Sequence, residues 1–164
     1  MAVINGVDVD RMKQMQGQMK KEPSVAERNP KMVAHWLGGS ASRIEFGDVV
    51  SKIGGDGNLN AMQTLLASMA ACDIDLVAMH AALIGLKIDE LSIEISGHFN
   101  VQAYFGIEDA PGPGYDSVAY TVHLKAPKAT PKQIKYLKEQ CERSSPVGDS
   151  LSKSIPLTLK IKSE

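Results

Sequence analysis

The sequence has few cysteines and no excess of charge of either sign, and each shortage excludes a class of protein. Two cysteines, Cys72 and Cys141, are too few for a disulfide scaffold and fit no zinc-binding spacing. A net charge of -1, from 18 basic and 19 acidic residues, gives no electrostatic footprint for nucleic acid or an anionic membrane. We therefore expect no metal or other cofactor and no nucleic-acid or membrane partner. The thiols are left for packing, redox chemistry or nucleophilic attack.

Targeting and membrane-spanning signals are also lacking. The N-terminus has no compact apolar segment of the secretory type, and no uninterrupted apolar run reaches the roughly 18 residues needed to span a bilayer. We expect a cytoplasmic protein. With 43% hydrophobic residues among 164, the chain is able to build one compact core.

The chain divides into an N-terminal arm and one domain. Residues 1–30 form the predicted arm, in which methionines recur at helical spacing over residues 10–21 and predict a short helix. Two prolines then disfavour helix up to residue 30. Residues 31–164 carry the patterns of a folded domain.

A long apolar helix is predicted at residues 61–86, with Asn60 as its N-cap. Large apolar side chains cover most of its circumference and alanines permit close approach of other elements, so the helix should be central and largely buried. Cys72 lies at its centre, followed by Asp73 and Asp75. A carboxylate beside a thiol would raise the thiol pKa, but neither aspartate has to share the face of Cys72.

Shorter elements surround this helix. Extended runs before it predict a hairpin, alternating strands follow it, Thr130 and Pro131 start another helix, and the chain closes with a predicted strand. There is no regular alternation of strand and helix. This order predicts an α+β fold with mostly antiparallel sheets. The closing segments are "SPVGDSLSKS", which predicts a short helix, and the strand "IPLTLKIK".

Several of these stretches resemble one known family. "GGDGNLNAMQTLLASMAAC", residues 54–72, is similar to the segment that opens the central helix of OsmC-like proteins, which include the organic hydroperoxide resistance proteins. The helix start "TPKQI" and the segment "SPVGDSL" resemble the same family, and the resemblance covers about residues 31–162. It implies an OsmC-like fold around a long central helix, a role in stress response, and an intertwined homodimer whose active sites are each built from both chains.

Catalytic members of that family are thiol-dependent peroxidases. The resemblance places Cys72 at the position of the cysteine that attacks the peroxide, and it provisionally assigns thiolate stabilisation to Arg43. The implied pocket lies at the dimer interface near the start of the helix. Its expected apolar lining residues are Met62, Leu65, Leu66 and Met69.

Two family positions are substituted in this chain. Ser145 stands where the family has the resolving cysteine, and a serine cannot form a disulfide. The helix-start glutamate, which pairs with the arginine, aligns with Met62 or Gln63, and neither is a carboxylate. Cys141 lies about one turn before Ser145, which favours a packing role over a resolving role.

Two hypotheses follow. In the first, Cys72 reduces organic hydroperoxides and an external thiol completes the cycle in place of the missing cysteine. In the second, the protein is a non-enzymatic member of the fold that binds a small apolar ligand, and Cys72 is structural.

Overall fold

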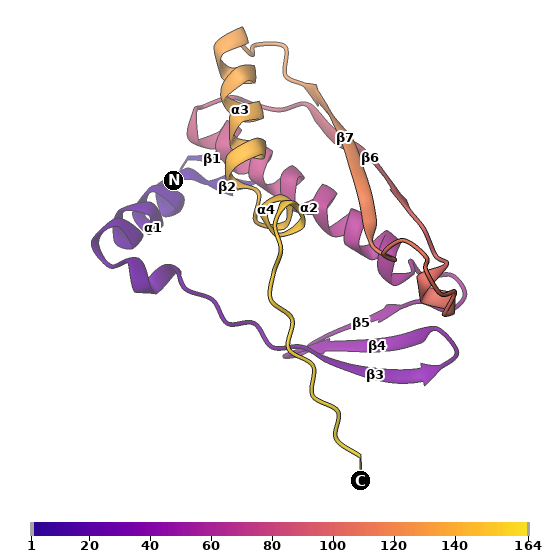
Figure 1. The fold of residues 1–164 in the computed structure, drawn as a ribbon. Helices are drawn as coiled ribbons and strands as arrows, with labels where there is room; N and C mark the ends of the chain where they lie inside the picture. Colours follow the sequence, from indigo (N-terminus) through magenta and orange to yellow (C-terminus); the bar gives the residue numbers. More distant parts are fainter. Residues whose placement is uncertain (1, 164) are drawn as a thin grey trace.

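A long central helix organises the computed structural model, which describes residues 2–163 (Figure 1). A long hairpin runs along one side of this helix, two further helices cover another, and a three-stranded sheet stands apart. All strand pairs in the described residues are antiparallel, which confirms the predicted α+β class. In chain order the elements are β1 (Val3–Ile4), β2 (Val7–Asp8), α1 (Val9–Lys21), the 3-10 helix η1 (Pro23–Ala26), β3 (Val33–Gly38), β4 (Ala41–Phe46), β5 (Val49–Ile53), α2 (Ala61–Leu83), β6 (Glu90–Phe99), the 3-10 helix η2 (Ala103–Phe105), β7 (Tyr115–Lys125), α3 (Pro131–Ser144) and α4 (Pro146–Ser152).

Helix α2 begins where the sequence predicts it. The Gln63 backbone N–H donates to the Asn60 side chain (2.8 Å), and the Asn60 N–H donates to the Gln63 side chain (3.0 Å), which completes a capping box. The helix ends at Leu83 rather than at Leu86. Gly85 turns the chain there with a φ of +70°, in the left-handed region that glycine adopts without strain.

Helix α3 also starts as predicted. Thr130 is the N-cap, its hydroxyl accepts a hydrogen bond from the Gln133 backbone N–H (3.3 Å), and Pro131 occupies the first helical position. One face of α3 packs on α2. The hydrophobic core therefore forms where these two helices and the β6–β7 hairpin meet.

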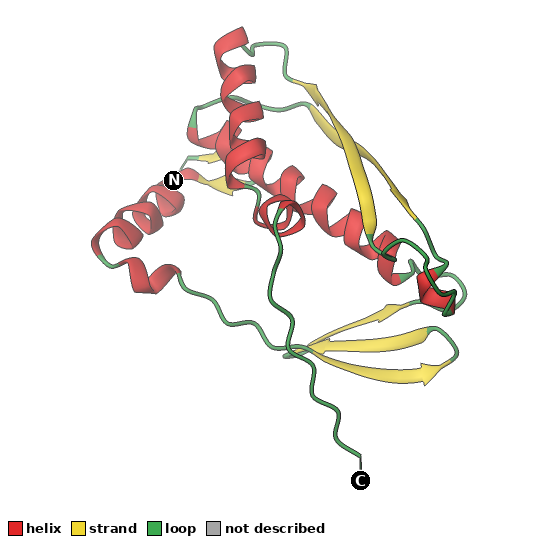
Figure 2. Ribbon diagram, in the orientation of Figure 1, coloured by secondary structure: helices red, strands yellow, loops and turns green. Residues whose placement is uncertain are grey.

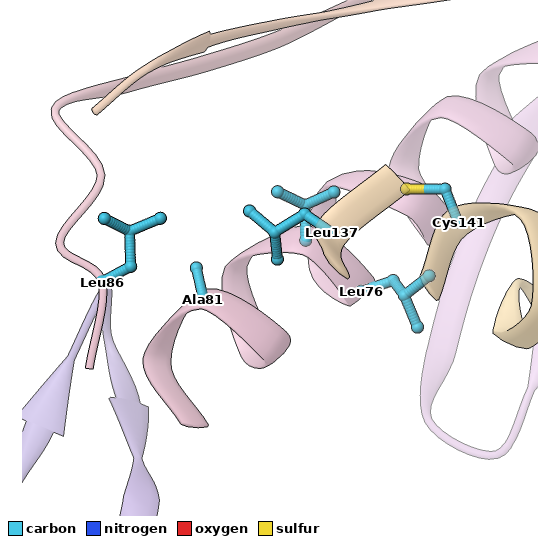
Figure 3. Packing of buried hydrophobic residues seen from close by; sticks show 6 residues of the cluster. Leu76, Ala81, Leu86, Leu137 and Cys141 are labelled. Atoms are coloured by element: carbon cyan, nitrogen blue, oxygen red, sulfur yellow. The ribbon is translucent and has the colours of Figure 1, made fainter. Parts of the chain in front are cut away.

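The core is one cluster of buried residues in the C-terminal half of α2 and the facing side of α3 (Figure 3). Half-buried side chains of β6 and β7, including Leu91, Val122 and Leu124, close over it. Burial of this apolar surface is the main stabilising contribution to the fold. The buried members of the cluster are Leu76, Val77, Ala81, Leu86, Leu137 and Cys141.

The predicted hairpin before α2 is extended to three strands, β3–β4–β5. Large apolar side chains on this sheet are exposed to solvent, among them Trp36, which is 77% exposed. Phe46 and Val49, which by the strand register share the face of Trp36, are exposed as well. This sheet therefore has an apolar face that the protomer itself does not cover.

The closing strand predicted over "IPLTLKIK" is wrong for this protomer, because no described strand pairs with that segment. The chain leaves α4 as an extended tail through residue 163 (Figure 2). Alternate apolar side chains along it are exposed, with Leu157 at 94% and Ile161 at 85%. The alternation is that of a strand, but a strand requires a neighbouring edge to accept its backbone hydrogen bonds.

The N-terminal arm contains the predicted helix, observed as α1. Before it, the β1–β2 hairpin places Asn5 at the end of α2. The Asn5 side chain donates to the Leu86 carbonyl (3.0 Å) and accepts from the Ile88 N–H (2.9 Å). The start of the arm is therefore attached to the core.

By length and composition alone, α2 is long and apolar enough to cross a membrane, with 33% of the relevant window buried in the protomer. The core helix of a water-soluble protein meets the same criterion. Asp73 lies within the helix and is buried against other elements of the chain, so we interpret this face of α2 as an interior face.

Candidate functional site

The candidate site is the point where α2 meets the corner between α3 and α4. Cys72 lies in the middle of α2 and is half-buried. Its Sγ is 3.9 Å from the Oγ of Ser145. The structure therefore brings together the two positions that the sequence singled out as the attacking cysteine and the substituted resolving cysteine.

Ser145 is fixed in this place by its role as a helix cap. It is only 4% exposed and separates α3 from α4. Its Oγ accepts a hydrogen bond from the Gly148 backbone N–H (3.0 Å), which caps the first turn of α4. Because that acceptor role leaves the hydroxyl proton free, Ser145 is able to donate it to the Cys72 sulfur.

Gly148 lies at a position where any side chain would collide with the capping side chain of Ser145. A Cβ at this position would lie 2.9 Å from the Ser145 Oγ and 3.1 Å from its Cβ. Gly148 was not among the predicted site residues. The only signal was its place three residues after a helix-capping serine.

The two residues at the helix-start glutamate position have other partners. Met62 offers its backbone carbonyl to the Tyr115 hydroxyl (2.9 Å), which ties β7 to the first turn of α2. Gln63 uses its side chain in the capping box with Asn60. Neither side chain supplies a carboxylate, and Tyr115 carried no signal in the sequence analysis.

Arg43 lies in β4, and its guanidinium pairs with Glu45 two residues on (2.6 Å). Among residues 2–163 it makes no hydrogen bond to Cys72. The structure of one protomer therefore leaves Cys72 without the expected cation. Ser145 is its one hydrogen-bonding side chain in the described part of the chain.

A cavity of about 750 Å³ lies beside the N-terminal half of α2. Leu65 and Met69 line it, as does Gly148, whose backbone N–H binds Ser145. Met62 and Leu66, which were also predicted to line the pocket, are half-buried and do not. Leu157 in the extended tail forms another part of the wall. The cavity is thus mainly apolar and adjoins the cap that holds Ser145.

Cys141 is placed in the core rather than at this site. It is 9% exposed and packs in the cluster with Leu76 and Leu137. Burial, and secondarily the charge of Asp73, raises the pKa of the Cys141 thiol to about 11. This thiol is therefore protonated at neutral pH and is a poor nucleophile.

The two aspartates after Cys72 differ in environment. Asp75 is exposed, whereas Asp73 is 1% exposed and neither of its oxygens has a hydrogen-bond partner among the described residues. Further along α2, His80 Nδ1 lies 2.8 Å from the Tyr136 hydroxyl, and burial lowers the pKa of this imidazole. His80 is thus a satisfied histidine at the edge of the core.

No group of three His, Cys, Asp or Glu side chains in residues 2–163 is arranged to hold a metal ion. The site itself offers a half-buried thiol with a hydroxyl donor beside it and an apolar cavity nearby.

Comparisons with known proteins concern the family and the fold. The family model described as OsmC-like protein matches residues 54–160. A search of the curated proteins found no match.

Solved structures share the fold at low sequence identity. The crystal structure of an OsmC-like protein from Mycoplasma pneumoniae is 13% identical, with a TM-score of 0.64, and the match covers 77% of this chain and 89% of that one. An organic hydroperoxide resistance protein from Legionella pneumophila is 17% identical, with a TM-score of 0.52 and coverage of 76% and 89%. Another from Elizabethkingia anophelis is 13% identical, with a TM-score of 0.52 and coverage of 76% and 88%. At these identities the likeness concerns the fold.

Proposed function

Since this chain belongs to the OsmC-like protein family, we propose that it reduces organic hydroperoxides through the single cysteine Cys72. The observation that carries the proposal is the 3.9 Å approach of the Ser145 hydroxyl to the Cys72 sulfur, at the two positions where the resemblance to the family implies a pair of reacting cysteines. A hydroxyl donor stabilises a thiolate, which is the nucleophilic form of cysteine.

The first step is attack of the Cys72 thiolate on the outer oxygen of the hydroperoxide. An S–O bond forms, the O–O bond breaks, and the leaving alkoxide takes a proton to become an alcohol. Cys72 is oxidised to a sulfenic acid while the peroxide is reduced.

The second step requires a reductant from outside the chain, because Ser145 has no thiol and Cys141 is buried in the core. A small thiol condenses with the sulfenic acid to give a mixed disulfide and water. A second small thiol then attacks that disulfide, releases the Cys72 thiol and leaves as the oxidised disulfide.

We also propose that the protein acts as a homodimer. The tail after α4, the apolar face of the β3–β4–β5 sheet and much of α2 are uncovered in one protomer. Exposed apolar surface of this extent is typical of an interface. Arg43, which does not reach the Cys72 of its own chain, would then approach the Cys72 of the other copy.

The test is intact mass after one equivalent of cumene hydroperoxide, with and without a sulfenic-acid trap. Wild type and Cys141→Ser should form a trap adduct, and Cys72→Ser should not. Consumption of the peroxide with excess dithiothreitol should follow the same pattern. An unreacted wild-type chain beside an active hydroperoxide reductase would contradict the proposal.

A second candidate function is non-enzymatic binding of a small apolar ligand, which the cavity beside Leu65 and Met69 favours. Under that hypothesis an apolar dye binds with equal affinity to wild type and Cys72→Ser, and neither consumes peroxide. The mass experiment separates the two functions.

A further inference from the structure

A second cavity, of about 660 Å³, lies between α2, β7 and α3, and buried core residues form part of its wall. Cys72 and Ser145 are not among its lining residues. Its walls are mostly apolar side chains, and its volume is within the range of small-molecule sites. The lining residues are Val77, Tyr120, Thr121, Val122, Leu124, Ile134, Leu137, Lys138, Cys141 and Glu142.

The charged residues that line this cavity offset each other. Lys138 and Glu142 are one helical turn apart on α3, and their side chains form an exposed ion pair (3.6 Å). Together they contribute no net charge. The cavity would therefore be neutral if its lining residues alone determined its field.

Asp73 adds an uncompensated charge directly behind the wall. It lies one turn before Val77 on the same face of α2, and Val77 lines the cavity. The Asp73 side chain is 1% exposed, and neither carboxylate oxygen is within normal hydrogen-bond distance of a partner in residues 2–163, although the Tyr120 phenol interacts with this carboxylate. A buried carboxylate without a cationic partner is costly, so a cationic group nearby would be strongly favoured.

Two groups on the cavity wall respond to this charge. Burial, followed by the Asp73 carboxylate, raises the pKa of the Tyr120 phenol, and the same two causes in the same order raise the pKa of Cys141. Both residues line the cavity. The field of Asp73 therefore extends to the wall where Tyr120 presents an aromatic ring.

We infer that this cavity is a binding site for a small apolar molecule that carries a primary ammonium group. The alkyl part fills the space between Val122, Leu124 and Leu137. The ammonium lies against Tyr120, where a cation is attracted both by the aromatic ring and by the buried charge of Asp73. An alcohol of the same shape lacks the charge, and a carboxylate is repelled.

The inference does not depend on peroxide chemistry, so the experiment uses the full chain with Cys72→Ser. Titration calorimetry with octylamine, octanol and octanoate should show saturable binding of octylamine, about tenfold or more tighter than of either other compound. Normal peroxide reduction by wild type together with a lack of octylamine binding would overturn this inference alone.

Asp73→Asn should weaken octylamine binding by about tenfold or more, since it removes the charge and nearly keeps the shape. Asp75→Asn is the matched control, because Asp75 is two residues away on α2 and exposed. It should bind octylamine like the parent chain.

A third variant guards against misfolding of Asp73→Asn. Ile134 lines the cavity but is 44% exposed, so Ile134→Trp adds bulk there without disturbing the buried core. It should abolish binding. Octylamine binding that is unchanged in Ile134→Trp, or octanol that binds as tightly as octylamine, would contradict the site. The site would also be contradicted if a second copy of the chain fills the cavity, which would be observed as a dimer that does not bind octylamine.

Discussion

The Cys72 Sγ lies 3.9 Å from the Oγ of Ser145, in a chain where these residues are 73 positions apart. The contact depends on the corner between α3 and α4, where Ser145 is held by its cap to the Gly148 N–H. A hydroxyl thus faces the Cys72 thiol at the position where the family resemblance implies a resolving cysteine. This relationship supports two predictions about the reacting pair.

Ser145→Cys should convert the site to two-cysteine chemistry. One equivalent of cumene hydroperoxide should yield a disulfide between Cys72 and the introduced thiol, seen by intact mass as the loss of two hydrogens and by peptide mapping. A thiol at this place is near enough to attack a sulfenic acid on Cys72.

Ser144→Cys is the matched control for that experiment. Ser144 is the neighbouring residue, but it is exposed and its hydroxyl lies by Gln140. It should leave a trappable sulfenic acid on Cys72. Equal disulfide formation in both variants would mean that the corner moves freely and that the observed approach is not a fixed geometry.

Ser145→Ala should slow alkylation of Cys72 by iodoacetamide at neutral pH, because the hydroxyl donor to the thiolate is lost. It also removes an N-cap, so urea unfolding should show a loss of about 1 kcal/mol. Ser150→Ala is a control for the general loss of a serine on α4. Ser150→Ala should keep the alkylation rate of wild type. An equal fall of the rate in Ser145→Ala and Ser150→Ala would show that the Ser145 hydroxyl does not activate Cys72.

Local signals in the sequence predicted much of the fold. Asn60 and Thr130 were correct as N-caps, because a cap depends on residues within one turn. The end of α2 was placed too late at Leu86, since the apolar pattern continues through the turn at Gly85. The closing strand failed for a different reason: its alternation is that of a strand, but no described strand of this protomer pairs with it.

The site was less predictable than the elements. α2 is apolar on nearly all sides, so its pattern did not reveal that Asp73 is on the buried face and Asp75 on the exposed one. The expectation that residue 145 lies near Cys72 rested on the family motif, because no spacing rule relates two positions so far apart in the chain. Arg43 had no local motif, and its ion pair with Glu45 follows from strand geometry that only the structure shows.

Asn5→Ala should destabilise the protein by about 2 kcal/mol in urea unfolding. The change removes hydrogen bonds to the Leu86 carbonyl and from the Ile88 N–H, both part-buried, and leaves these backbone groups unpaired. Asn58→Ala is the matched control, since Asn58 is exposed and bonds only to the nearby Asp56 carbonyl. A loss in Asn5→Ala no greater than in the control would show that the arm does not stabilise the core.

The raised pKa of Cys141 predicts a dependence of stability on alkaline pH. The pKa is about 11 in the folded chain against 9.0 for a free thiol, so the contribution of the neutral thiol is complete below pH 9 and is lost as pH rises through 11. Urea unfolding of wild type and Cys141→Ala between pH 8 and 11 should show the advantage of wild type shrinking by on the order of 2 kcal/mol. Burial raises the pKa of Tyr120 in both proteins, so this main cause cancels in the difference; the contribution of the Cys141 charge to the Tyr120 pKa is smaller and is lost in Cys141→Ala. A difference that stays constant over this range would mean that the Cys141 thiolate is tolerated in the folded chain, and that the thiol is not held in the core by burial.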